Sequence, residues 1–294
     1  MKQAILITAY RDIGFINKII EALDENYTYY IHLDRKQQYD GSLLSSLKEH
    51  QSVRLLSRQF RVNWGSIQHL EAILHLVEEA LKDNETEYMH LITGQDFPVK
   101  SSEAMTAFLR EHVGKEYITG SRLPDKKWKN GGIERIGYYN FYEAFNGKNR
   151  GRLLIKGLVL LQKKLGINRS LPKALPTLYG GTTYWTLSRN ALKYIKGFLA
   201  SHPEIMKRFR YTFCAEEIVI HSILMQDNSP FRNRIAQNNL RYIIWQHRDG
   251  HYPANLDERD WHDIQQTDAF FARKFAFPVS AKLCKLIEES VFNK

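Results

Sequence analysis

Cysteine is scarce in this sequence, whose 294 residues contain only Cys214 and Cys284. The two do not form a CxxC pair, and neither belongs to a cluster of Cys and His with the spacing of metal ligands. We therefore expect neither a disulfide framework nor a structural zinc, and we expect a reducing compartment, the cytoplasm. The histidines form no HxH or HExxH pattern, so the sequence gives no sign of a catalytic metal.

Long apolar runs are missing as well. The apolar stretch within residues 1–10 is too short for the hydrophobic region of a signal peptide and far too short to span a bilayer. We interpret it as the first strand of the fold, and we expect a cytoplasmic protein.

Two nucleotide-binding signatures are also absent. No GxGxxG follows a predicted strand, and no GxxxxGK[ST] occurs, which argues against a dinucleotide-binding domain and against a P-loop enzyme. The sequence has no internal repeat and no low-complexity linker. With 43% hydrophobic residues it can form one large domain or two closely packed halves.

Basic residues are in excess, giving a formal net charge of +10. This favours an anionic partner, which could be a nucleic acid, the phosphates of a nucleotide or an acidic membrane face. No nucleic-acid-binding motif accompanies the charge, so we do not expect a nucleic-acid partner.

Apolar periodicity predicts strands that alternate with helices in the first part of the chain. The predicted strands are Ala4–Thr8, Tyr29–Leu33, Val53–Leu56, Tyr88–Thr93 and Tyr117–Thr119, and the predicted helices are Phe15–Leu23, Ile67–Leu81 and Ser101–His112. This order indicates an α/β fold with a mostly parallel twisted sheet and helices on both faces. Ligands of such sheets bind beyond the carboxyl ends of the strands, where Asp34 and Asp96 lie.

The second part of the chain is less regular. Residues 122–178 are basic and irregular, except that Leu153–Leu165 is apolar with interspersed cations. That segment predicts either a core helix, which we favour, or an amphipathic helix lying on an anionic membrane. From Tyr179 onward we expect a strand, a helix over Arg189–Leu199, a helix containing Glu216 and Glu217, and a strand over Leu240–Trp245.

Several polar residues are candidates for chemistry. Adjacent residues of a helix point in different directions, so one of Glu216 and Glu217 can face a ligand. A carboxylate in a partly apolar pocket has a raised pKa and can act as a general base, whereas the ordinary alternative is a pair of surface glutamates. Arg241 and Lys274 adjoin apolar segments, where a cation needs an anion, either a ligand diphosphate or an internal carboxylate.

Three further positions have both a functional and a structural interpretation. Asp34 could bind a nucleotide base or ribose, or simply close a turn. Trp64, ahead of Gly65 and Ser66, could adjoin a phosphate at a helix N-terminus. We favour instead a buried tryptophan followed by Ser66 as the N-cap. Asp96 could orient a bound sugar or hold its own loop in place.

These pieces occur together in a recognisable order along nearly the whole chain. The ordered segments are Ile5–Tyr10, His32–Lys36, Val62–Ser66, Gly94–Pro98, Gly181–Arg189, Ala215–Glu217, Leu240–Trp245 and Phe271–Phe275. In the order of these segments, the chain resembles the core-2/I-branching β-1,6-N-acetylglucosaminyltransferase family. This family also contains peptide O-xylosyltransferases. It is similar to a short bacterial member without a stem or membrane anchor.

The resemblance implies a GT-A-like fold and an inverting, metal-independent transfer from a UDP-sugar. The family's catalytic base falls on Glu217, its two diphosphate contacts on Arg241 and Lys274, and its residue near the uridine on Asp34. Ala215-Glu216 stands where Pro-Asp is usual, and Gly-Thr-Thr stands where Gly-Ser-x is usual. The transferred sugar and the acceptor are therefore left open.

We accordingly predict one GT-A-like domain over residues 1–294, with a nucleotide-binding half (1–121) and an acceptor-binding, catalytic half (122–294). The predicted donor-binding residues are Asp34, Trp64, Asp96, Arg241 and Lys274, and the predicted acceptor-binding residues are Arg135, Tyr184, Trp185 and Glu216. No cofactor or metal is expected.

The predicted reaction moves GlcNAc from a UDP-sugar to a hydroxyl of a glycan acceptor during synthesis of a bacterial surface polysaccharide. A UDP-xylose donor and a catalytically inactive sugar-binding relative are the alternatives. The acceptor could be lipid-linked, and the segment around Leu153–Leu165 could then touch the inner face of the cell membrane.

Overall fold

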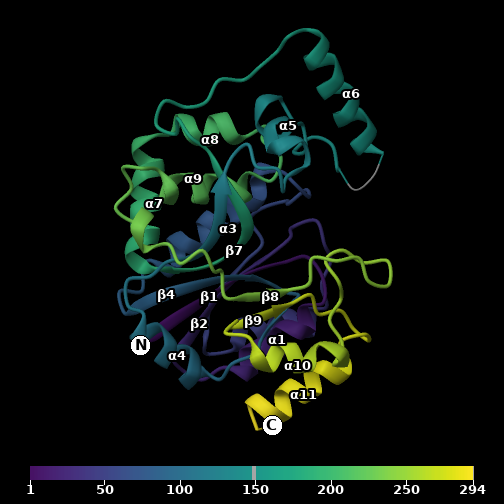
Figure 1. Cartoon of the computed structure of the whole chain (residues 1–294). Helices are drawn as coiled ribbons and strands as arrows, with labels where there is room; N and C mark the ends of the chain where they lie inside the picture. Colours follow the sequence, from purple (N-terminus) through teal and green to yellow (C-terminus); the bar gives the residue numbers. More distant parts are fainter. Residues whose placement is uncertain (148–149, 294) are drawn as a thin grey trace.

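A six-stranded sheet forms the centre of the molecule, seen here in a computed structural model that describes residues 1–147 and 150–293 (Figure 1). The strand order is β3-β2-β1-β4-β7-β6. The strands are β1 (Lys2–Ala9), β2 (Tyr27–Leu33), β3 (Val53–Ser57), β4 (Thr86–Thr93), β6 (Tyr117–Arg122) and β7 (Tyr179–Ser188). The first four run parallel, and β7 is antiparallel to both of its neighbours. The mostly parallel sheet predicted from the sequence is confirmed.

Alternating side chains of the strands build two separate cores. In β1, Ile5 and Ile7 belong to one core, while Ala4 and Leu6 belong to the other. A strand that is apolar on both faces must be covered on both faces, and it is. One layer consists of α3 (Ile67–Ala80), α7 (Arg189–Ser201) and α9 (Val219–Met225). The other consists of α1 (Ile13–Ala22), α2 (Gly41–Glu49), α4 (Ser102–Glu111), α10 (Trp261–Gln266) and α11 (Ala281–Val291) (Figure 1).

The strand order has a switch point between β1 and β4. From β1 the chain winds outward through β2 to β3, and it then returns to place β4 on the other side of β1. Such a reversal opens a crevice beyond the carboxyl ends of the two strands, which is where α/β sheets bind ligands. Here those ends carry Thr8 and Thr93.

A second, three-stranded sheet brings the C-terminal part of the chain to this switch point. Its order is β5-β9-β8, with β5 (Asp96–Pro98) antiparallel to β9 (Phe271–Arg273) and β8 (Arg241–Ile243) parallel to β9. The register pairs Asp96 with Arg273, so the C-terminal aromatic segment lies beside the loop that follows β4.

Several elements differ from those predicted. Helix α2 was not predicted, and the late strand β8 has three residues rather than six. Glu216 and Glu217 lie in a 3-10 turn, η2 (Ala215–Glu217), just before α9 rather than within a longer helix. The irregular region contains a short 3-10 turn, η1 (Lys129–Gly132), and the helix α5 (Ile133–Gly137). The short helix α8 (Glu204–Phe209) precedes η2.

The segment that we interpreted as a core helix forms α6 (Gly151–Lys164), but it is not part of the core. Leu153 is 72% exposed and Leu165 65% exposed, whereas only Ile155 and Gln162 of the helix are buried. The core interpretation was therefore wrong, and α6 projects from the upper end of the molecule (Figure 1). Among the described residues, no helix combines the length and the apolar character needed to cross a membrane.

Candidate active site

The ion pair between Glu217 and Arg135 lies at the centre of the candidate site. Arg135 Nη1 donates to Glu217 Oε2 at 2.5 Å, and both side chains are about a quarter to a third exposed. Arg135 comes from α5 and Glu217 from η2, and the guanidinium lies over the rings of Trp128 (4.3 Å) and Phe213 (4.9 Å). The aromatic rings fix the guanidinium by packing and by cation–π attraction.

The carboxyl of Glu217 is prepared to exchange a proton near neutral pH. Burial and the negative charge of Glu216 raise its pKa to about 7, against the lowering effect of Arg135. A group with a pKa near the working pH is suited to general-base catalysis, since it is largely unprotonated and still a good proton acceptor.

Glu216 points the other way. Its Oε1 lies 3.1 Å from His69 Nδ1, and His69 Nε2 lies 3.2 Å from Thr8 Oγ1. The side chain of Glu216 is 5% exposed. The prediction that it binds the acceptor is therefore wrong, because the side chain is turned into the protein toward α3 and the end of β1. The predicted divergence of the two adjacent carboxylates is present.

Glycine at position 65 allows the loop that carries Trp64 to pack closely against Phe213 and Cys214, just before η2. Gly65 has φ +82, and a Cβ there would lie 2.3 Å from the ring of Phe213. Its carbonyl accepts a hydrogen bond from Cys214 N at 3.0 Å. Any side chain would be strained by the backbone and would also displace the ring. This close contact places Trp64 against Phe213, with ring centroids 5.0 Å apart.

The family described as Core-2/I-Branching enzyme matches residues 4–269. This chain belongs to the Core-2/I-Branching enzyme family. The fold is accordingly α/β and GT-A-like, as predicted.

The chain is 24% identical to the Drosophila melanogaster protein named xylosyltransferase oxt, over 95% of this chain and 32% of that protein. It is 23% identical to human xylosyltransferase 1, over 88% of this chain and 27% of that protein. The chain thus spans about a third of the length of these curated relatives.

Solved structures are more distant. The S. aureus TarS 1–349 structure in complex with UDP gives a TM-score of 0.31 and 12% identity, over 40% of this chain and 35% of that one. The apo structure of the bifunctional glycosyltransferase WbbM gives a TM-score of 0.41 and 11% identity, over 100% of this chain and 50% of that one. Scores this low carry no argument about the site.

In this Core-2/I-Branching member, Asp34 supports the loop that carries Trp64. Asp34 Oδ1 accepts hydrogen bonds from Lys36 N and Val62 N, both at 3.1 Å. Trp64 is 48% exposed, which contradicts our interpretation of a buried tryptophan. Ser66 is the N-cap residue of α3, but its side chain makes no capping hydrogen bond.

Asp96 is fully buried and holds its own loop. Its Oδ2 accepts from Thr93 N at 2.7 Å, Thr93 Oγ1 at 2.6 Å and Arg273 Nη1 at 2.9 Å. With no exposed surface it cannot touch a donor, so the structural alternative for Asp96 holds and its predicted donor contact is corrected.

The side chain of Arg241 is also buried and hydrogen-bonded within the protein. Its guanidinium donates to the carbonyl oxygens of Leu91, Trp185, Asn239 and Leu240 and to Thr186 Oγ1. It lies over the ring of Phe271 at 4.6 Å. In this structure carbonyl oxygens surround the guanidinium, and a contact between Arg241 and the diphosphate stays a prediction. These bonds join the small sheet to the large one.

The aromatic pair of β7 is buried rather than presented to an acceptor. Trp185 has no exposed surface and belongs to the core, so its predicted acceptor contact is wrong. Tyr184 is nearly buried, with the guanidinium of Arg273 over its ring at 4.8 Å. Burial raises the pKa of Tyr184.

Lys274 is half-buried beside the switch point. Its carbonyl accepts from Leu256 N at 2.9 Å, and the next residue, Phe275, donates its N–H to Gln95 O at 2.9 Å. These bonds fix the backbone of Lys274 next to the loop after β4.

Three ligand atoms of Cys214, Glu216 and Glu217 lie within 4.8 Å of one another. Two of these side chains are already engaged, Glu216 by His69 and Glu217 by Arg135. Burial raises the pKa of the Cys214 thiol well above its usual value, which disfavours the thiolate that a soft metal needs. The guanidinium on Glu217 would repel a cation, so we do not interpret this cluster as a metal centre.

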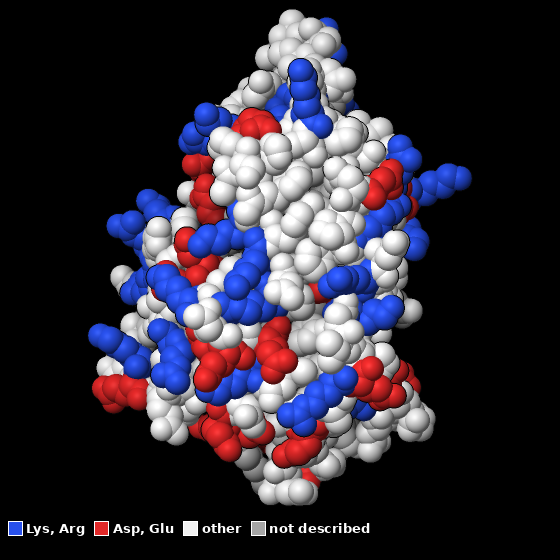
Figure 2. Space-filling view, turned by 90° about the vertical axis from the view of Figure 1, so that its left-hand side faces the viewer, with Lys and Arg blue, Asp and Glu red and all other residues white. Residues whose placement is uncertain are grey.

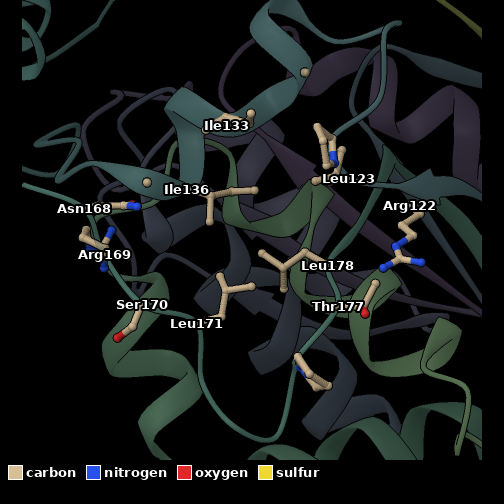
Figure 3. Close-up of a pocket in the computed structure, with 14 residues that line it drawn as sticks. Arg122, Leu123, Ile133, Ile136, Asn168, Arg169, Ser170, Leu171, Thr177 and Leu178 are labelled. Atoms are coloured by element: carbon tan, nitrogen blue, oxygen red, sulfur yellow. The ribbon is translucent and has the colours of Figure 1, made fainter. Parts of the chain in front are cut away.

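A cavity of about 400 Å³ lies on another side of α5. Ile133 and Ile136 line it from this helix, together with Leu171 and Leu178, and Figure 3 shows Ile136, Leu171 and Leu178 pointing toward one another. Glu217 does not line this cavity, whereas Arg135 of the same helix pairs with Glu217.

Sequence reasoning missed His69, Thr8, Phe213 and Arg273. Thr8 ends a predicted strand and His69 begins a predicted helix, so the two lie where ligand-binding residues gather. Nothing in the sequence pairs them with Glu216, which is 147 residues from His69. Arg273 adjoins Lys274, and only the pairing of β9 with β5 shows that it faces Asp96.

Proposed function

We propose that this chain is a metal-independent, inverting UDP-sugar glycosyltransferase in which Glu217 is the catalytic base. The observation that carries the proposal is the partly buried carboxyl of Glu217, with its pKa raised to about 7 and with Arg135 at 2.5 Å. Family membership supports a sugar transfer, and the position of the carboxyl supports its role as the base.

In the proposed reaction, Glu217 removes the proton of the acceptor hydroxyl while that oxygen attacks the anomeric carbon. The bond from the anomeric carbon to the UDP oxygen breaks on the opposite face, so the configuration inverts. Negative charge grows on the β-phosphate, where a fixed cation is most effective because it needs no reorganisation. We assign this role to Lys274, beside the switch point. Asp34 and the Trp64 loop would flank the nucleotide.

The donor sugar is proposed as GlcNAc, with xylose as the alternative. The xylosyltransferase names of the curated relatives favour the alternative. Release of UDP from UDP-GlcNAc, UDP-xylose, UDP-glucose and UDP-galactose would decide between them, measured with and without oligosaccharide acceptors. A clear preference for one donor supports the proposal, and no UDP release from any donor would reject it in favour of an inactive sugar-binding relative.

We propose that the acceptor is a glycan that binds between the Trp64 loop and α5, which belongs to the half of the chain from residue 122 onward. The exposed ring of Trp64, which meets the ring of Phe213 edge to face, offers a flat face to a sugar. Arg135 would then contact the acceptor as well as the base. A bacterial surface polysaccharide is the proposed product.

The exposed helix α6 supports a lipid-linked acceptor and a contact with an anionic inner membrane face. Its exposed leucines include Leu153, Leu154, Leu160 and Leu161. Residues 150–167 contain Arg and Lys but no Asp or Glu. In Figure 2 the uppermost part of the molecule, at the height where Figure 1 places α6, shows uncharged and basic side chains. Apolar and basic side chains on one helix suit the surface of an anionic bilayer.

A further inference from the structure

We propose that His69 and Glu216 form a positioning pair that maintains Glu217 as an effective base. His69 holds the side chain of Glu216 in place, and the charge of Glu216 acts on the neighbouring carboxyl of Glu217. The inference rests on the proposed function, in which Glu217 takes the acceptor proton. Neither His69 nor Glu216 touches the substrate in this scheme.

The imidazole of His69 is fixed at both ring nitrogens. Nδ1 faces Glu216 Oε1 at 3.1 Å, and Nε2 faces Thr8 Oγ1 at 3.2 Å. A carboxylate only accepts, so Nδ1 is the donor toward Glu216, and in the neutral ring Nε2 accepts the hydroxyl hydrogen of Thr8. Thr8 lies one residue before the end of β1 and His69 lies in the first turn of α3, so two rigid elements orient the ring.

Glu216 depends strongly on this one contact. The side chain is 5% exposed, and within the described residues its Oε2 is buried without a hydrogen-bond partner. A buried carboxylate that lacks partners is costly. The donor at His69 Nδ1 offsets part of that cost and fixes the direction of the carboxylate. A costly buried charge beside the proposed base is difficult to explain by stability alone, and its effect on Glu217 supplies a reason.

Groups from four elements face Glu217. Arg135 comes from α5, His69 from α3, Tyr184 from β7, and Glu216 and Cys214 from the turn around η2. Burial and the charge of Glu216 raise the pKa of Glu217, whereas Arg135 and any positive charge on His69 lower it. If the charge of Glu216 were lost, only burial would oppose Arg135, so the pKa of Glu217 would fall and Glu217 would be a weaker base.

The pH dependence of kcat/KM tests the pair, because its acid limb follows the base of the free enzyme. Glu216→Gln should move this limb to lower pH by on the order of one unit. It should also lower the rate on the plateau, because the base is weaker. His69→Phe should do the same, since Glu216 would then lose the donor that holds its charged side chain beside Glu217. His69→Asn should retain the wild-type limb, because its amide nitrogen lies near the position of Nδ1.

The double variant His69→Phe/Glu216→Gln separates this role from two independent structural effects. If His69 acts through Glu216, the double variant should shift no further than Glu216→Gln alone. The inference would be overturned if the shifts of the two single variants added up in the double variant. It would also be overturned if the acid limb of these variants stayed at the wild-type pH while their thermal stability fell.

A readout without turnover keeps the inference distinct from the proposed function. Carboxyl NMR of protein with labelled glutamate, assigned with Glu217→Gln, follows the titration of Glu217 directly. A lower pKa of Glu217 in both Glu216→Gln and His69→Phe supports the pair, even if no UDP-sugar is consumed. An unchanged titration rejects the pair, even if the protein is an active transferase.

Discussion

Arg135 Nη1 and Glu217 Oε2 meet at 2.5 Å although the two residues are 82 positions apart in the sequence. The contact joins the short helix α5 of the irregular region to the turn that precedes α9. Since an ion pair occupies one oxygen of the carboxylate, an acceptor hydroxyl must use the other oxygen or displace the guanidinium. The proposed base is thus held ready by a residue on the acceptor side.

Replacing Glu217 by Gln tests its role as the base. The amide keeps the shape but cannot take a proton, so we expect UDP binding to persist while the transfer rate falls at least about a hundredfold. The rate should also lose the acid limb of its pH profile. Calorimetric titration with UDP and a coupled UDP-release assay measure the two effects, and turnover close to that of the wild type would show that another group is the base.

Removing the charge of Arg135 should move the acid limb of the pH profile of kcat/KM to higher pH, opposite to the shift expected for Glu216→Gln. Arg135 lowers the pKa of Glu217, which burial and Glu216 raise to about 7. In Arg135→Met that opposing effect is lost, so the pKa rises and the acid limb of kcat/KM moves to higher pH. Activity near pH 6 should therefore fall more than activity near pH 8. Equal losses at both pH values would mean that Arg135 does not act through the titration of Glu217.

The sequence allowed the sheet and its helices to be predicted because apolar periodicity is local. Ile5–Ile7 and Ile67–Leu76 carry their own strand and helix patterns. The site was predictable only in part, because Glu217 was recognised through its motif. Arg135, which pairs with Glu217, and His69, which pairs with Glu216, come from distant elements. Trp185 was predicted to touch the acceptor although it is buried, because a sequence shows which residues adjoin apolar segments but not which face the core.

The contrast between Lys274 and Arg241 gives a test of the anion site. Lys274→Met should cost about two to three orders of magnitude in rate, the usual scale for one charge-stabilising group. Arg241→Met removes buried hydrogen bonds to carbonyl oxygens and should lower the melting temperature instead. Thermal melts and UDP release separate these outcomes. A rate that is unaffected in Lys274→Met would place the diphosphate elsewhere.

Chelation tests the proposed independence from metal. If Lys274 balances the diphosphate, activity should persist in excess EDTA at the level of an untreated sample. Among the described residues, Cys214, Glu216 and Glu217 form a cluster of possible metal ligands. Two of its carboxylates are already paired, Glu216 with His69 and Glu217 with Arg135. Complete loss in EDTA with recovery on addition of Mn²⁺ or Mg²⁺ would contradict the proposal.

Helix α6 predicts salt-sensitive binding to anionic membranes. Lys156, Lys163 and Lys164 are exposed on it, and each basic residue near an anionic surface contributes on the order of 1 kcal/mol. We expect cosedimentation with vesicles containing phosphatidylglycerol at low salt, weaker binding at high salt through screening, and little binding to neutral vesicles. The triple variant Lys156→Glu/Lys163→Glu/Lys164→Glu should lose most of the binding.

A matched control separates the effect of α6 on vesicle binding from the effect of the net charge. Lys48, Lys282 and Lys285 are exposed on α2 and α11, in the layer on the opposite face of the sheet from α3, α7 and α9. Changing these three to Glu alters the net charge by the same amount and should leave vesicle binding nearly intact. Replacing Leu153 and Leu160, which are exposed on α6, by Ser should weaken binding without changing the charge. If both triple variants lose binding equally, or if wild-type protein does not bind at low salt, α6 is not a membrane contact and a soluble acceptor is favoured.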